Sequence, residues 1–441
     1  MKYFVIILAI IMCFIPLRVQ AAETITRQDM AVRLVNFLGY GSLAAQVESF
    51  EANPFTDVHN YIGYIIIAND LGLMSPAGFG IFDPHGTVTI EEATDLFSNA
   101  WHRSTVPLSW VHGFYAFGAF AQRYLIHDMD SVSFGWSQME WDAVNGARLN
   151  TSGEWRIPEG YQTILDFTTT ESGAKAHLNV FMDTTMGLDL MIACQVSRST
   201  AVAAILNETA LYSGVTINFE GLRGEQSKAD FTAFLTELAA NLRPRNLSLY
   251  VTVHPSTIDG IYFDGYDFRQ IGYLADRVIL MAHDYHPRSL EGFMGTEWQR
   301  NAALTPIAEV YRALKSITDP LTGVQDRSKI AIAFNFASIG WFVDEYNRAI
   351  YPRPVTPAMD TVIRRMSQPD THFGWSYNFR NPYIIYNTEA GERVFLWHEN
   401  ARSVYEKLKL ARLFNITGAS IWRIGIIPNA YNWDVWPNFS S

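Results

Sequence analysis

Residues 214–222 read GVTINFEGL, a pattern typical of a β-strand that ends on one acid. β-Branched and aromatic residues favour a strand, and alternation along it places Thr216, Asn218 and Glu220 on one face. In a strand that is buried on both faces, a carboxylate is costly unless it is paired or used chemically. Glu220 is therefore the first candidate catalytic residue, and Asn218, two positions before it on the same face, is the second.

The composition limits what kind of protein this is. The chain has 441 residues, of which 49% are hydrophobic and 14% aromatic, enough for one large domain and a smaller one. The formal net charge is -11 and no basic run stands out, so a nucleic-acid partner has no electrostatic support. Aromatic rings in this number suit the binding of flat, weakly polar ligands such as sugars, although most of them are expected in the core.

The first 22 residues have the pattern of a secretory signal peptide. One lysine precedes an apolar run from Tyr3 to Pro16, and small residues follow at the positions where cleavage occurs. The run is short for a membrane span, and an uncleaved anchor is the alternative. We expect residues 1–22 to be removed, leaving one thiol, Cys194, and no membrane contact. The mature protein would be secreted or associated with the cell surface, the cell wall or a spore.

Residues 23–103 contain two related segments, ITRQDMAVRLVNFLGY from Ile25 and VTIEEATDLFSNAW from Val88. Each begins with a threonine placed to cap a helix and continues with apolar residues at helical spacing. With the Gly-rich loop between them, they resemble one S-layer homology repeat and the second half of another. Arg27 matches the basic residue of that repeat. The resemblance implies binding to a cell-wall polymer, and a small packing domain is the alternative.

Residues 104–441 alternate short strand-like runs with amphipathic helical patterns. The eight runs are WVHGFYAF, DSVSFGW, KAHLNVFMD, GVTINFE, LSLYVTV, RVILMAHDYH, KIAIAFNFA and GASIWRIG. They predict an α/β fold, a (β/α)8 TIM barrel. A doubly wound open sheet is the alternative, but the sequence has no glycine-rich phosphate loop. The stretch from Trp341 to Trp397 predicts a small α+β insertion before the last strand, forming one wall of a groove.

In a barrel of this kind, functional side chains lie at the carboxyl ends of the strands. Glu220 ends the fourth run, Asp284 the sixth and Trp422 the eighth, so we expect the three to meet at one rim. A metal site is one interpretation of the segment around Asp284, because His283 and His286 lie close to it in the sequence. Strand alternation, however, directs His283 to the face opposite Asp284 and His286. We therefore expect no metal site.

Four segments resemble the family-18 glycoside hydrolases, in particular the bacterial branch that includes spore cortex-lytic N-acetylglucosaminidases. They are HGFY, GVTINFEGL, VILMAHDYH and FLWHENARSVYEKLKLARLFNITGASIWRIG, and the resemblance spans about residues 108–428. The fourth strand of that family carries Asp-x-x-Asp-x-Asp-x-Glu. The matching positions here are Ser213, Thr216, Asn218 and Glu220, so only the final acid is kept. In the sixth-strand motif Met-x-Tyr-Asp, the tyrosine is replaced by His283.

The resemblance implies hydrolysis of β-linked N-acetylglucosamine polymers without a cofactor, with peptidoglycan or spore cortex favoured over chitin. In that family the substrate's own acetamido oxygen is the nucleophile and the anomeric configuration is retained. Glu220 would be the acid/base, and Asn218 and Asp284 would complete the catalytic set. The residues expected to contact the sugar are Phe114, Met281, His283, Tyr285 and Trp422. Asn218 brings no negative charge, so a weakened or inactive glycan-binding barrel is the alternative.

Overall fold

The computed structural model describes residues 25–255, 264–429 and 433–440. By contact the chain divides into two units, Met1–Val106 with Lys409–Asn415, and Pro107–Leu408 with Ile416–Ser441. The signal-peptide prediction concerns residues 1–22, which lie outside the described residues. Within the described ranges, no helix has the length and apolar character needed to cross a membrane.

The first unit is mainly helical. Its elements are β1 (Ile25–Thr26), α2 (Arg27–Phe37), α3 (Gly41–Phe50), α4 (Ile62–Asp70), β2 (Thr87–Val88) and α5 (Ile90–Thr105). Two helices begin after the predicted threonines: Thr26 caps α2, and Thr89 forms a capping box with Glu92 at α5. Helix α3 was not predicted because the residue before it, Tyr40, gives no side-chain cap.

Arg27 is held within the first unit. Its Nε donates to the carbonyl oxygen of Phe82 at 2.9 Å, and a terminal nitrogen donates to the carbonyl oxygen of Ser75 at 2.6 Å. The guanidinium also lies 4.7 Å from the centre of the Phe82 ring. Arg27, which was predicted to match the basic position of an S-layer homology repeat, therefore ties the start of α2 to residues 75 and 82 of the same unit.

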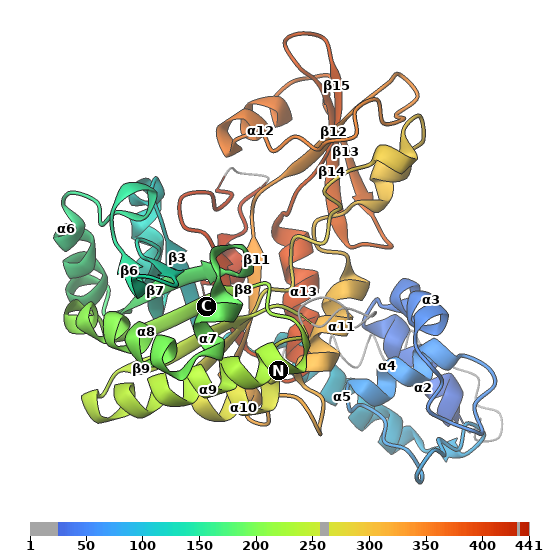
Figure 1. Cartoon of the computed structure of the whole chain (residues 1–441). Coiled ribbons are helices and arrows are strands. Elements are labelled where there is room, and N and C mark those ends of the chain that lie inside the picture. Colours follow the sequence, from blue (N-terminus) through green and yellow to red (C-terminus); the bar gives the residue numbers. More distant parts are fainter. Residues whose placement is uncertain (1–24, 256–263, 430–432, 441) are drawn as a thin grey trace. The chain divides into compact units, whose positions relative to one another are not determined.

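The second unit contains the predicted eight-stranded parallel barrel (Figure 1). Its strands are β3 (Trp110–Tyr115), β4 (Ser131–Phe134), β7 (Lys175–Asp183), β8 (Gly214–Glu220), β9 (Ser248–Val253), β10 (Arg277–Leu280), β11 (Ile330–Asn335) and β16 (Gly418–Trp422). Pairing of β4 with β7 closes the ring. All eight predicted runs form barrel strands, and the TIM-barrel prediction is confirmed. A hairpin, β5 (Gln138–Asp142) and β6 (Gly146–Asn150), extends the sheet beside β7.

Helices connect the strands and cover their outer faces (Figure 1). They are α6 (Tyr161–Asp166), α7 (Leu188–Ala193), α8 (Gln195–Asn207), α9 (Gly224–Leu242), α10 (Phe268–Leu274), α11 (Ile307–Ile317) and α13 (Ala401–Leu413), with 3-10 helices and one π-helical turn between them. Phe219 of β8 packs on Phe231 and Phe234 of α9, with ring centres 6.1 and 5.2 Å away. The apolar residues of β8 therefore face the helices, as alternation predicts.

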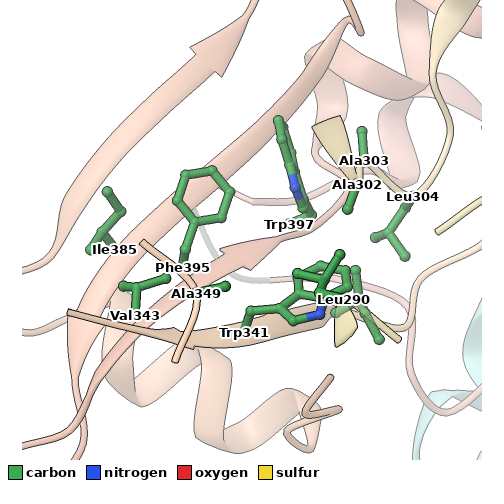
Figure 2. Close-up of a cluster of buried hydrophobic side chains, with 11 residues drawn as sticks. Leu290, Ala302, Ala303, Leu304, Trp341, Val343, Ala349, Ile385, Phe395 and Trp397 are labelled. Carbon is green, nitrogen blue, oxygen red and sulfur yellow. The ribbon is translucent and has the colours of Figure 1, made fainter. Parts of the chain in front are cut away.

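The predicted α+β insertion lies between β11 and β16. It consists of β12 (Ile339–Val343), α12 (Met359–Met366), β13 (His372–Ser376), β14 (Asn381–Asn387) and β15 (Arg393–Trp397), with the antiparallel strand order β12-β15-β14-β13. Trp341 and Trp397 are buried in the hydrophobic cluster of Figure 2, together with Phe395 and Leu290. This cluster packs the sheet of the insertion on the segment between β10 and α11, which supplies Leu290 and residues 302–304.

The barrel interior holds a buried network of hydroxyl and imidazole groups. It runs through Ser420, His112, Ser133, Thr216, His177 and Ser248, with separations of 2.6 to 3.4 Å. Burial lowers the pKa of His177 to about 3 and that of His112 well below its usual value. Both rings are therefore neutral at neutral pH, and each can donate with one nitrogen and accept with the other.

These histidines predict acid-sensitive stability. An unfolded histidine binds a proton near pH 6.5, whereas folded His177 does so only near pH 3. The unfolded state binds more protons in that window, so the free energy of unfolding should fall as pH drops from 6.5 towards 3. The slope is up to about 1.4 kcal/mol per pH unit for each such histidine. Denaturant unfolding of His177→Gln should show a shallower pH slope than wild type.

The matched control is His372→Gln, because His372 lies exposed on β13. It should keep the wild-type slope. Equal slopes for the two variants would contradict the assignment of acid sensitivity to the buried ring.

Candidate functional site

A cavity of about 550 Å³ lies at the carboxyl ends of the barrel strands. Its lining residues are Phe114, Trp155, Asn179, Phe181, Asn218, Glu220, His254, Pro255, Met281, His283, Asp284, Tyr285, Ala333 and Trp422. All eight site residues predicted from the sequence are in this set. None of the lining residues comes from the insertion, so the prediction that the insertion forms one wall is wrong for this cavity.

Glu220 is the last residue of β8, and its side chain is 33% exposed. Its Oε2 lies 3.6 Å from Nε2 of His254, which follows β9 directly. The charge of Glu220 also acts on Tyr266. Burial, and to a lesser extent this charge, raises the pKa of the Tyr266 hydroxyl above its usual value. The carboxyl group is thus accessible from the cavity and has an imidazole beside it. Sequence analysis missed His254, although a polar residue directly after the run LSLYVTV was the available signal.

Asn218 lies deeper than Glu220 and is 3% exposed. Its Oδ1 accepts a hydrogen bond of 2.5 Å from the hydroxyl of Thr252 on the neighbouring strand β9. Thr216, two residues earlier, is fully buried and belongs to the interior network. Because an amide oxygen has two acceptor positions, Thr252 fixes the Asn218 side chain and leaves one position for a ligand.

The segment after β10 departs from the predicted geometry. The strand ends at Leu280, and Asp284 has a positive φ of 61°. Strand alternation therefore does not apply, and the prediction that His283 and Asp284 face opposite ways is wrong. His283 Nδ1 lies 2.9 Å from Asp284 Oδ2, and Asn335 of β11 donates to both carboxylate oxygens at 3.0 and 2.8 Å.

Asp284 is held in its ionised form. Burial raises its pKa, but the charge and hydrogen bond of His283 and the hydrogen bonds from Asn335 together outweigh burial and bring the pKa to about 2. The cavity therefore carries a fixed negative charge at neutral pH. Across the described ranges, no three His, Cys, Asp or Glu side chains gather closely enough to hold a metal ion.

Aromatic rings form the apolar part of the cavity. Trp422 contacts Phe114 edge-to-face at 5.1 Å, and Trp155 stacks on Phe181 at 5.0 Å. The hydroxyl oxygen of Tyr285 is buried without a hydrogen-bond partner in the described chain. Tyr285, Met281 and His283, which were predicted to contact the sugar, all line the cavity.

Comparison with known proteins decides the family. The sequence profile described as Glycosyl hydrolases family 18 matches residues 160–426, more than half of the chain. The chain belongs to this family. The match includes seven of the eight predicted site residues, because only Phe114 precedes it.

The chain is also similar to curated proteins named cortical fragment-lytic enzyme, from Bacillus subtilis (strain 168) and Bacillus anthracis. The first is 24% identical over 218 residues, covering 49% of this chain and 47% of the relative. The second is 25% identical over 224 residues, covering 50% and 47%. The chain thus spans about half the length of the curated relatives it matches.

Solved structures show the same fold at low identity. The spore cortex-lytic enzyme SleL of Bacillus cereus superposes with a TM-score of 0.56 at 17% identity, covering 75% of this chain and 73% of that one. A chitinase from Chromobacterium violaceum superposes with a TM-score of 0.59 at 18% identity, covering 75% and 97%.

The hydrogen bonds around Asp284 generate a prediction about its pKa. Asn335→Ala removes two donors to the carboxylate, so the pKa of Asp284 should rise from about 2. The rise is measurable by NMR titration of the aspartate carboxyl carbons. Asn387→Ala is the control, because Asn387 donates to Asp370 in the insertion instead. An Asp284 pKa that is the same in both variants would contradict the proposed hydrogen bonding.

Proposed function

We propose that the protein is a glycosidase that hydrolyses β-linked N-acetylglucosamine polymers, with peptidoglycan or spore cortex as the favoured substrate. The observation that carries the proposal is an accessible acid at the end of β8, Glu220, in one cavity with Asn218, Asp284 and Trp422. Family 18 uses one acid together with the substrate's acetamido group, which matches this arrangement. The names of the curated relatives, cortical fragment-lytic enzymes, support a cortex-type polymer.

In the proposed reaction, Glu220 first acts as the general acid. It gives its proton to the glycosidic oxygen while the bond between that oxygen and the anomeric carbon breaks. The acetamido oxygen of the same sugar bonds to the anomeric carbon and forms an oxazolinium ion. Glu220 then takes a proton from water as the water oxygen attacks that carbon, which reopens the ring and retains the configuration. The apolar faces of Trp422 and Phe114 would support the sugar ring.

Asn218 and Asp284 would divide a task that one aspartate performs in the family motif. Asn218 has an acceptor position left for the acetamido N–H, so it can orient this group. It supplies no charge. Asp284, ionised in the same cavity, supplies the negative charge that favours the cationic intermediate.

We also propose that the protein is exported and retained at the cell wall or spore. The signal-like pattern of residues 1–22 and the S-layer-homology resemblance of residues 23–103 support this. Arg27 bonds within its own unit, so contact with a wall polymer would depend on other residues of the module.

The acid/base assignment predicts the effect of Glu220→Gln. Hydrolysis of N-acetylglucosamine oligomers should fall by roughly 10²- to 10⁴-fold, the usual contribution of general acid catalysis. Oligomer binding, measured by calorimetry, should stay nearly intact. The control is Glu225→Gln, since Glu225 is an exposed acid on α9 and should not affect the rate. Undiminished hydrolysis in Glu220→Gln would refute the assignment. Oligomer binding by a wild type that does not hydrolyse would favour the glycan-binding barrel.

Because Asn218 is neutral, we predict that Asn218→Asp raises the rate of hydrolysis. The Thr252 hydroxyl already donates to this position, so a carboxylate there would have a hydrogen-bond partner. A charge-assisted hydrogen bond to the acetamido N–H is worth about 1 kcal/mol more than a neutral one, so kcat should rise roughly fivefold if that gain is made in the transition state. Asn218→Leu, which cannot orient the acetamido group, should be slower than wild type. A fall in kcat for Asn218→Asp would show that the site works through a neutral amide.

A further inference from the structure

A second cavity, of about 670 Å³, lies within the same unit but shares no lining residue with the cavity around Glu220. It is bounded by the end of α12, by β13 and β14 of the insertion, by the start of α13 and by Trp433. Four aromatic rings line it, those of Phe373, Trp375, Tyr383 and Trp433. Neither the acid/base chemistry nor the barrel core accounts for this cavity.

His398 gives the second cavity a hydrogen-bond acceptor. The residue is 3% exposed, and its Nδ1 lies 3.1 Å from the backbone carbonyl oxygen of Glu399, so Nδ1 carries the hydrogen. Burial lowers the pKa of His398 to about 4, which keeps the ring neutral. Its Nε2 is buried and has no hydrogen-bond partner in the described chain. A buried acceptor without a hydrogen-bond donor costs free energy. A ligand that donates a hydrogen bond to Nε2 would therefore be favoured.

Trp375 and Arg402 add a donor and a positive charge. The indole N–H of Trp375 is also buried without a partner in the described chain. The Arg402 guanidinium lies 4.0 Å from the Trp375 ring centre and 5.6 Å from that of Tyr377. Within the described ranges, Arg402 has no carboxylate within salt-bridge distance. A stacked guanidinium keeps its in-plane N–H groups available for a carboxylate.

The wall that carries His398 is held rigidly. Glu399 is fully buried and pairs with Lys407 at 2.9 Å. Asn381 donates to the same carboxylate at 2.6 Å, and the indole N–H of Trp433 donates to the Glu399 backbone carbonyl. Since these contacts fix the neighbours of His398, a ligand would find its acceptor already in place.

We propose that this second cavity binds a carboxylated, N-acetylated sugar unit of the N-acetylmuramic acid type. Aromatic rings contact the apolar face of a sugar, and an unpaired acceptor and an unpaired donor on residues that line the cavity suit its hydroxyl and acetamido groups. Arg402 suits the carboxylate that distinguishes this sugar from N-acetylglucosamine. The choice of sugar rests on the proposed function, because peptidoglycan contains both sugars. Such a site would bind a part of the polymer that is separate from the glycosidic bond being hydrolysed.

The test measures the affinity of full-length protein for N-acetylmuramic acid and for N-acetylglucosamine by calorimetry. Arg402→Gln should weaken N-acetylmuramic acid binding roughly tenfold, the loss expected for a hydrogen bond between charged groups. Its N-acetylglucosamine affinity should change less than about twofold. The matched control is Arg353→Gln, because Arg353 is an exposed arginine of the insertion that does not line the cavity. It should leave both affinities unchanged.

Two further measurements distinguish failure of this inference from failure of the proposed function. Trp375→Phe keeps an aromatic ring but removes the N–H, so it should weaken the binding of N-acetylmuramic acid. Hydrolysis of N-acetylglucosamine oligomers, measured in parallel, should be the same in Arg402→Gln and wild type. An Arg402-dependent affinity in a protein without hydrolysis would support this site and refute the proposed function. Equal N-acetylmuramic acid affinities in the two arginine variants, or equal losses for both sugars in Arg402→Gln, would overturn the inference.

Discussion

The parallel pairing of β8 with β9 positions the catalytic candidates. Thr216 lies opposite Tyr250 and Ile217 opposite Val251 in this register. Two residues after Thr216, the Asn218 side chain accepts a hydrogen bond from Thr252 of β9. Two residues after Asn218, the Glu220 carboxylate lies beside His254, which follows the end of β9. A shift of one residue would turn all three polar side chains of β8 towards the helices. The register therefore determines both the core beneath the cavity and the acid at its rim.

The two acids of the cavity differ in their surroundings, and this difference suggests their roles. Asp284 receives hydrogen bonds from Asn335 and lies beside His283, which fixes it as an anion. Glu220 lies at the rim with one imidazole 3.6 Å away. An acid that must both give and take a proton cannot be tied to several donors. Glu220 is therefore suited to proton transfer and Asp284 to electrostatic stabilisation.

The sequence predicted the parts that depend on local pattern. Each barrel strand carries its own β-branched run, and alternation along residues 214–220 identifies the inward side chains correctly. Prediction from the sequence pattern was wrong where the chain leaves regular secondary structure. The left-handed conformation of Asp284 brings His283 and Asp284 together, and no periodicity reports such a turn. His254 and the unpartnered nitrogen of His398 depend on neighbours from distant segments, so only the folded structure reveals them.

The interior of the barrel explains how the chain tolerates the loss of the family's acids. This chain has hydroxyl residues, Ser213 and Thr216, where the family motif has aspartates, and the interior network joins Thr216 to neutral His177 and to Ser133. A neutral network avoids the cost of buried charge at neutral pH, and it makes the barrel sensitive to acid. Among the described residues that line the cavity, Glu220 and Asp284 are the only acids, and Asp284 is the one held as an anion, so it is placed to balance a positive charge formed there.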